Sequence, residues 1–236
     1  MICGIQDCYV AVSDSLASNG NWKKIAASES YRATTSPTYA VVGSTVLSAL
    51  EASPNLFQIL DFSQDDNQWE TVDFNISSFA YSCMAAINDT SFILIGGGIS
   101  GKLTQIYNFK TGIWTRLPDM EPGRYGSKCI NYMDGIMVVG GECNPTDSTY
   151  YTSNDVNFFN LTSNIWQKFP SMNNARYAHI LAPVNGIPTV IGGNSGQGLV
   201  TYSEQYINGK WNNWIEQIPG VDYHSFVQVS KDDFHC

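Results

Sequence analysis

Residues 106–125 read IYNFKTGIWTRLPDMEPGRY, and a close relative of this stretch, NFFNLTSNIWQKFPSMNNARY, occupies residues 157–177. Each copy has an aromatic residue seven positions before a tryptophan, an apolar-Pro-x-Met step after it, and an Arg-Tyr pair that begins ten positions after the tryptophan. Self-similarity at a spacing of about 50 residues is typical of repeat proteins, which stack copies of one supersecondary unit. The repeat therefore has to be recognised before any single segment is assigned.

Tryptophan marks the same phase in each repeat. Five tryptophans follow one another at spacings of 47, 45, 52 and 45 residues, namely Trp22, Trp69, Trp114, Trp166 and Trp211. A second landmark is an apolar run that ends in Gly-Gly, as in ILIGG, MVVGG and TVIGG, with degenerate versions at residues 41–44 and 1–4. Because two independent landmarks agree in register, the chain contains about five repeats.

Each repeat carries signals for four short strands. In the third repeat, residues 81–87 are mostly apolar at both odd and even positions, as expected of an inner strand buried on both faces. Residues 91–97 form the second strand, residues 103–109 alternate, and a turn with a glycine leads to the outer strand at residues 113–117. The fourth repeat follows the same course at 127–131, 135–141, 156–160 and 165–169. No stretch has a convincing 3.6-residue period, so almost no helix is expected.

A four-stranded antiparallel unit of this size cannot bury both of its faces alone. Radial stacking lets each sheet cover its neighbours, which predicts an all-β chain with a β-propeller of about five blades. The predicted single domain spans residues 1–236, with blade segments at about 1–27, 31–72, 80–117, 125–169, 177–218 and 224–236. The recurrent tryptophan is interpreted as packing between blades, since such a ring buries a large apolar area.

These landmarks resemble the kelch repeat family, and the resemblance covers essentially the whole chain. It rests on the Gly-Gly step, on an aromatic residue seven positions before tryptophan, and on an arginine ten positions after it (Arg32, Arg124 and Arg176). The second repeat departs from the pattern, with Ser44 for a glycine and Phe79 for the arginine, and the fifth has Val221 there. The resemblance implies a kelch-type β-propeller.

The two ends of the chain allow two interpretations. Residues 1–4 resemble the tail of a second strand, and residues 225–229 resemble an inner strand. Either the termini complete one shared blade, which would bring Cys3 near Cys236, or the chain is a piece of a larger propeller, since kelch propellers usually have six or seven blades. The composite five-bladed ring is the favoured expectation.

Composition excludes several classes of partner. The chain has 21 acidic and 12 basic residues, a net charge of −9, so binding to nucleic acid is not expected. No run of about 18 apolar residues occurs, so membrane insertion is not expected either. The first ten residues, MICGIQDCYV, lack the features of a signal peptide. The sequence leaves the oligomeric state open.

The compartment also stays open between extracellular and cytoplasmic. Six cysteines and three sequons, at Asn75, Asn88 and Asn160, favour an oxidising compartment where these asparagines carry glycans. Buried free thiols and chance sequons are the alternative. Six cysteines allow 15 pairings, so the sequence does not give the connectivity.

The candidate binding residues lie on loops expected at one mouth of the propeller, where rigid sheets hold variable loops. Arg32, Arg124 and Arg176 recur at one repeat position. They either fix the loops against backbone carbonyls or form a ring of guanidinium groups for a partner's carboxylates, as the resemblance implies. Tyr125 and Tyr177 follow two of these arginines. The long polar loop at residues 142–155 adds Tyr150 and Tyr151, a residue type well suited to recognition.

His179 and His224 each lie 13 residues after a repeat tryptophan and should face similarly on adjacent inner strands. Two histidines facing an axial channel could bind a metal, but no third ligand is evident, so hydrogen-bonded channel residues are the preferred interpretation and no metal or cofactor is expected.

The leading functional hypothesis is a non-enzymatic module that binds a peptide or protein partner through the mouth loops. The resemblance implies recognition of a partner as in kelch adaptors, which recruit substrates through attached BTB and BACK domains. No such domains are visible in this sequence, so only the recognition is expected here. One alternative is a secreted, disulfide-linked and glycosylated kelch protein that binds an extracellular ligand. The other is an enzyme related to kelch sugar isomerases or oxidases, although no nucleophile elbow, phosphate loop or zinc motif is apparent.

Overall fold

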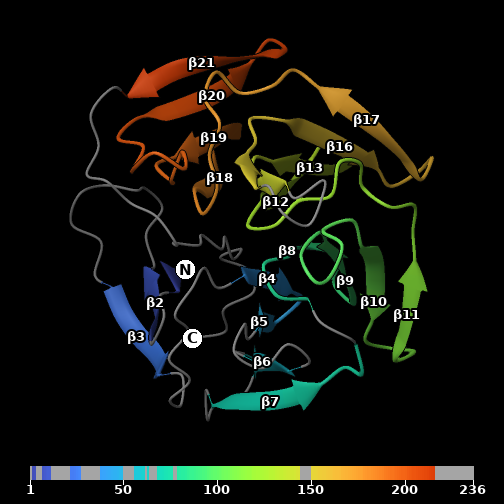
Figure 1. Ribbon diagram of the computed structural model, residues 1–236. Helices are drawn as coiled ribbons and strands as arrows, with labels where there is room; N and C mark the ends of the chain where they lie inside the picture. The colour runs from blue at the N-terminus through green and yellow to red at the C-terminus, as the bar shows by residue number, and fades with distance from the viewer. Residues whose placement is uncertain are drawn as a thin grey trace.

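Antiparallel sheets surround a common centre in the computed structural model, as Figure 1 shows. The structure describes residues 38–49, 56–61, 63, 68–76, 79–143 and 150–215, and the backbone of three earlier strands, 2–3, 7–11 and 22–27. Within these residues every regular element is a β-strand. The all-β propeller expected from the repeats is confirmed.

The described strands pair in the order of the chain, as a meander. The sheet nearest the N-terminus consists of β1 (Ile2–Cys3), β2 (Asp7–Ala11) and β3 (Trp22–Ala27). The second contains β4 (Thr38–Val42), β5 (Thr45–Ala49), β6 (Leu56–Asp61) and β7 (Trp69–Asp73). The third contains β8 (Cys83–Asn88), β9 (Ser91–Ile95), β10 (Thr104–Asn108) and β11 (Ile113–Arg116).

The remaining described sheets follow the same plan. The fourth contains β12 (Lys128–Tyr132), β13 (Gly135–Val139), β16 (Val156–Asn160) and β17 (Ile165–Phe169). The fifth contains β18 (Ile180–Val184), β19 (Ile187–Ile191), β20 (Ser203–Ile207) and β21 (Lys210–Ile215). A small hairpin of β14 (Glu142–Cys143) and β15 (Tyr151–Thr152) lies within the long loop of the fourth blade, where no strand was expected.

The hydrophobic core lies between adjacent blades. In β9, Phe92 and Leu94 pack towards the second blade, whereas Ile93 and Ile95 pack towards the fourth. The central strand of the fourth blade, β13, divides its side chains between its two neighbours in the same way. Since successive side chains of a strand point to opposite faces, a strand buried on both sides must be apolar at every position. This is the physical reason for the continuous apolar runs.

The aromatic-to-tryptophan spacing comes from a hairpin register. Tyr107 pairs with Trp114, and Phe159 with Trp166, each seven positions apart, across the two outer strands of their blades. In the fifth blade the turn is shorter, and Tyr206 pairs with Trp211, five positions later. Each indole N–H then donates a hydrogen bond to a carbonyl of the preceding loop, at 2.9 to 3.1 Å, on Phe74, Pro118 and Pro170 respectively. The tryptophans therefore tie each blade to the one before it.

The Gly-Gly pairs mark the point where the second strand leaves the sheet. β9 ends at Ile95, and Gly96 and Gly97 follow with positive φ. A Cβ atom on Gly97 would lie 2.3 Å from the backbone nitrogen of Ser82, just before the inner strand. Only glycine permits both this backbone conformation and so close an approach. The inner strand itself begins at Cys83 rather than at residue 81, because Tyr81 has a left-handed φ of 61°.

Two cysteines join neighbouring blades. Cys83 on β8 and Cys129 on β12 form a disulfide between adjacent inner strands, 46 residues apart in the sequence. Cys143 is a buried free thiol. The expected proximity of Cys3 and Cys236 lies outside the described residues. Within the described part of the chain, no helix is long and apolar enough to cross a membrane.

Candidate functional site

The repeat arginines point into the blades. Arg124 has no exposed surface, and its guanidinium donates to the carbonyl of Asp155 at 2.7 Å and to the side-chain oxygen of Asn157 at 2.9 Å. Arg176 is equally buried, and it donates to the carbonyl of Gly192 at 2.9 Å. Each arginine is part of a loop between two blades, and its side chain extends into the following blade. Neither guanidinium faces the solvent.

The two arginines differ in the charge of their partners. Arg176 forms an ion pair with Glu204 at 2.6 Å, and neither side chain is exposed. At the matching position of the fourth blade Arg124 meets the neutral Asn157. The pKa of Arg124 falls to about 10, mainly because burial disfavours the charged form. In the third blade the matching residue is Gln105, and Phe79 stands where the arginine is expected, so the amide nitrogen of Gln105 lacks a partner among the described residues.

The Arg-Tyr pairs connect the loops of successive blades. The Arg124 carbonyl accepts a hydrogen bond from Gly97 at 2.9 Å, and Tyr125 exchanges two backbone hydrogen bonds with Glu142, at 2.8 and 2.9 Å. Arg176 and Tyr177 repeat this arrangement with Gly141 of the fourth blade and Asn194 of the fifth. The buried guanidinium groups thus position the tyrosines that follow them.

Loops of three successive blades meet on the same face of the propeller. The Tyr125 hydroxyl donates to the Ile99 carbonyl at 2.9 Å, and its ring packs edge-on against Tyr150, with centroids 6.4 Å apart. On the other side, a Cβ on Gly196 would lie 2.9 Å from the Thr152 hydroxyl, so the loop of the fifth blade touches the fourth. We call this surface the mouth face. Its exposed apolar and aromatic side chains are Ile99, Tyr150, Tyr151 and Leu199.

Electrostatics at the mouth face centre on the fourth blade. A hydrogen bond with the Cys143 thiol, with a further contribution from burial, raises the pKa of Tyr151 to about 12. Partial burial raises the pKa of Glu142. Tyr151 is therefore neutral at neutral pH, and the Glu142 carboxyl group is partly removed from water. Glu142 was not singled out from the sequence, because nothing in the repeat pattern marks the residue after the second glycine.

His179 lies at the start of an inner strand and is completely buried. Both ring nitrogens lack hydrogen-bond partners among the described residues, as do the hydroxyls of Ser82 and Ser127 at the matching repeat positions. Burial, and then the charges of Arg176 and Lys128, hold the pKa of His179 well below its usual range. No cluster of three potential metal ligands occurs among the described residues. His224 and Arg32, which the sequence pairs with these positions, lie outside them.

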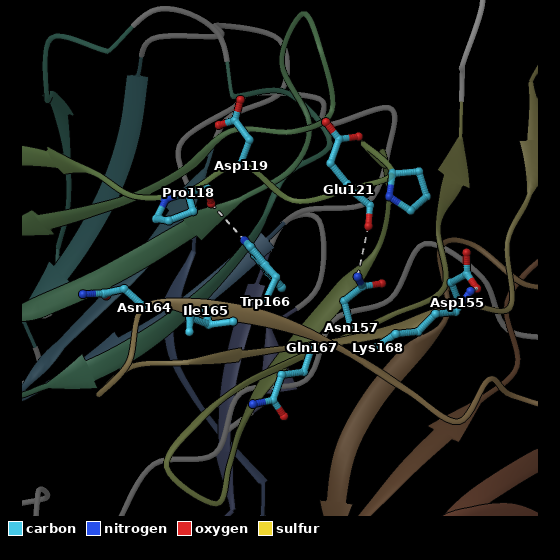
Figure 2. Close-up of a pocket in the computed structure, with 11 residues that line it drawn as sticks. Pro118, Asp119, Glu121, Asp155, Asn157, Asn164, Ile165, Trp166, Gln167 and Lys168 are labelled. Carbon is cyan, nitrogen blue, oxygen red and sulfur yellow. Dashed lines mark hydrogen bonds and ion pairs between the residues drawn. The ribbon is translucent and has the colours of Figure 1, made fainter.

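A lateral pocket of about 500 Å³ opens between the third and fourth blades. Figure 2 shows Asp119, Glu121 and Asp155 around it, with the Trp166 indole directed to the Pro118 carbonyl. Each carboxylate is paired within the chain: Asp119 with Arg116, Glu121 with Lys102 at 2.7 Å, and Asp155 with Lys168 at 3.0 Å. The pocket is adjacent to the mouth loops, but its charges are largely compensated.

The three sequon asparagines lie at or near turns. Asn75 and Asn88 are exposed. Asn160 uses its side-chain oxygen to accept hydrogen bonds from the backbone of Thr162 and Ser163, and its amide donates to Asp134. The Asn160 side chain is therefore held by hydrogen bonds within a turn. The Asn75 side chain makes no such bond among the described residues.

Comparison with known proteins agrees with this architecture. Kelch-like protein 24 of Rattus norvegicus, Homo sapiens and Mus musculus is 31% identical to this chain over 113 residues. The match covers 47% of this chain and only 17% of each relative. A solved structure titled "Structure of YjhT" aligns with a TM-score of 0.66 and 20% identity, over 80% of this chain and 67% of that one. No family model matches the chain.

The fold and the inter-blade contacts define a kelch-type β-propeller. The repeat motifs, now explained by specific contacts, are similar to those of the kelch repeat family, and about half of the chain resembles the kelch-like proteins in sequence. Because the matched stretch is a small part of the kelch-like proteins, their activities and partners are not transferred to this chain.

Proposed function

We propose that this chain is a non-enzymatic protein-interaction module that binds a peptide or protein partner at its mouth face. The observation that carries the proposal is the contact between the loops of three successive blades. These contacts join Ile99, Tyr150 and Leu199, which are 90%, 61% and 50% exposed, into one surface on a rigid support. Exposed aromatic and aliphatic side chains grouped in this way favour a protein-binding role.

The complete burial of Arg124, Arg176 and His179, whose pKa values are all lowered, also favours binding over catalysis. Active sites usually place such groups in an open cleft. Here Arg124, Arg176 and His179 have no exposed surface and make their contacts inside the blades. In this proposal the arginines act as positioning residues for Tyr125 and Tyr177, rather than as contacts to the ligand.

The test is affinity capture from a cell lysate with mass spectrometry, followed by measurement of binding to each recovered protein. We expect Ile99→Ser combined with Tyr150→Ala to reduce binding at least about tenfold, since central aromatic residues dominate interface energies. The melting temperature should stay nearly unchanged, because both side chains are exposed.

A matched control uses Met133, an exposed side chain in the turn between β12 and β13, at the end of the inner strand away from the mouth face. Met133→Ser should leave binding intact. Equal binding by the control and by the Ile99 and Tyr150 variant would place the interaction elsewhere and overturn the proposal.

A secreted protein that binds an extracellular ligand is a second candidate. It is favoured by the Cys83–Cys129 disulfide, since structural disulfides persist in oxidising compartments. Cell fractionation of the tagged natural protein distinguishes the two candidates. Recovery from the medium with glycans on Asn75 would favour the secreted form, and recovery from the cytosol with six free thiols would exclude it.

A further inference from the structure

Glu142 occupies the centre of the mouth face. Its backbone pairs with Tyr125 on one side and with Thr152 on the other. Residues opposite one another in antiparallel pairs project their side chains to the same side, so the Glu142 side chain leaves the backbone between those of Tyr125 and Thr152. Tyr125 also contacts the Tyr150 ring, and Thr152 contacts Gly196 of the next blade. Glu142 therefore starts from the point where the loops of three blades come together.

This carboxylate is not neutralised by the described chain. It forms no ion pair among the described residues. The neighbouring arginine, Arg124, is turned into the blade and bonded to Asp155 and Asn157. The matching positions of the third and fifth blades hold Gly98 and Asn194, which are uncharged. Partial burial without a cation is unfavourable for a carboxylate, and a ligand can supply that cation.

The loops predicted to form the mouth carry a strong excess of acidic residues. Residues 44–55, 73–80, 98–102, 118–124, 142–155, 170–176, 194–200 and 219–223 contain eight acidic and three basic residues. Two of the basic residues are the buried Arg124 and Arg176, and the third, Lys102, is paired with Glu121. Two of the acidic residues, Asp119 and Asp155, are also paired, with Arg116 and Lys168 on the strands beside these loops. An acidic partner segment would therefore meet repulsion here, contrary to the ring of guanidinium groups considered from the sequence.

We infer that the mouth face recognises a protein segment in which an arginine or lysine is flanked by apolar residues. The cation binds the Glu142 carboxylate beside the rings of Tyr125 and Tyr150, and the flanking side chains cover Ile99 and Leu199. A carboxylate gives a charge-assisted hydrogen bond, and tyrosine faces add a cation–π attraction of modest size. This inference rests on the proposed function and specifies the chemistry of its partner.

The experiment uses a phage-displayed library of random linear peptides, selected on the wild-type chain and on Glu142→Gln. The matched control is Glu70→Gln, which removes an exposed carboxylate from the outer strand β7. We expect arginine and lysine, next to apolar residues, to be enriched on the wild type and on the control. This enrichment should disappear on Glu142→Gln. A synthetic peptide from the wild-type selection should bind Glu142→Gln at least about tenfold more weakly.

The outcomes separate the two proposals. Enrichment of aspartate or glutamate on the wild type, or equal enrichment of cations on Glu142→Gln, would overturn this inference and leave the interaction module standing. Absence of any enrichment over the bare support would count against both. Because Glu142 is held in place by hydrogen bonds of its backbone, Glu142→Gln should melt close to the wild-type temperature. This melting measurement separates a lost preference from lost folding.

Discussion

Arg176 and Glu204 form a fully buried ion pair, with the guanidinium nitrogen 2.6 Å from the carboxylate oxygen. The arginine comes from the loop that leaves the fourth blade, and the glutamate lies on the third strand of the fifth. The same carboxylate accepts a hydrogen bond from the backbone of Asn173 at 2.7 Å, in the loop that carries the arginine. This network fixes the course of the chain between the two blades.

Arg176→Ala should lower the free energy of unfolding by about 3–5 kcal/mol, because it leaves Glu204 charged and buried without its cation. Urea unfolding measures this change. The double variant Arg176→Met with Glu204→Leu should recover most of the loss, because it removes both charges. A neutral result for Arg176→Ala would contradict the buried position of the pair.

Trp211→Ala should destabilise the chain by about 3–5 kcal/mol, as the loss of a large buried aromatic side chain usually does. Trp211 packs on Tyr206 and donates its indole N–H to the Pro170 carbonyl. Trp214, on the same strand, is 43% exposed and provides the control. Trp214→Ala should be nearly neutral in the same thermal or urea unfolding assay. Equal effects of the two substitutions would contradict the packing between blades.

Stability should decrease as the pH falls below about 6.5, the usual pKa of histidine, because His179 stays neutral in the folded chain and takes up a proton when unfolded. The unfolded state then binds more protons, so the free energy of unfolding falls by up to about 1.4 kcal/mol per pH unit. Urea unfolding of the wild type and of His179→Gln at about pH 7.5 and about pH 5.5 measures this contribution.

The difference between those two proteins isolates His179. Partial burial raises the pKa of Glu142, which contributes with the opposite sign, but it is present in both proteins and cancels. Parallel pH profiles for the wild type and His179→Gln would show that the imidazole is not kept neutral by its burial.

Reduction of the Cys83–Cys129 disulfide should lower stability by about 2–4 kcal/mol, because the bond closes a long loop in the unfolded chain. Thermal unfolding with and without a reductant measures the loss. The variant Cys83→Ala with Cys129→Ala should melt near the reduced wild type and should not respond to the reductant. A count of six reactive thiols in the denatured, unreduced protein would show that the bond is absent.

The repeat pattern predicted the third and fourth blades almost strand by strand. Predicted outer strands at 113–117 and 165–169 correspond to β11 (Ile113–Arg116) and β17 (Ile165–Phe169). This works because blade packing demands an aromatic residue, a tryptophan and two glycines at fixed places, and these demands are visible in the sequence. The hairpin of β14 and β15 was not predicted, since its two-residue strands lie in a loop without periodicity.

The site was harder to predict than the fold. Tyr125 and Tyr150, both predicted on mouth loops, have their rings in contact. The sequence left open whether the arginines serve the interior or a ligand. That choice depends on which acceptors the next blade places opposite them, such as the Asp155 carbonyl for Arg124. Every residue has a backbone carbonyl, so the residue type at position 155 does not reveal that it accepts this hydrogen bond.

The sequence by itself determined that a four-stranded unit repeats and must stack around an axis, because each unit is apolar on both faces and cannot be buried alone. Only the tertiary structure decided the direction of individual polar side chains. In it, the side chains of Arg124 and Arg176 point into the blades and His179 is completely buried. Glu142 lies on the mouth face and forms no ion pair with the described residues. Such directions follow from contacts between blades, which the order of residues along one strand does not encode.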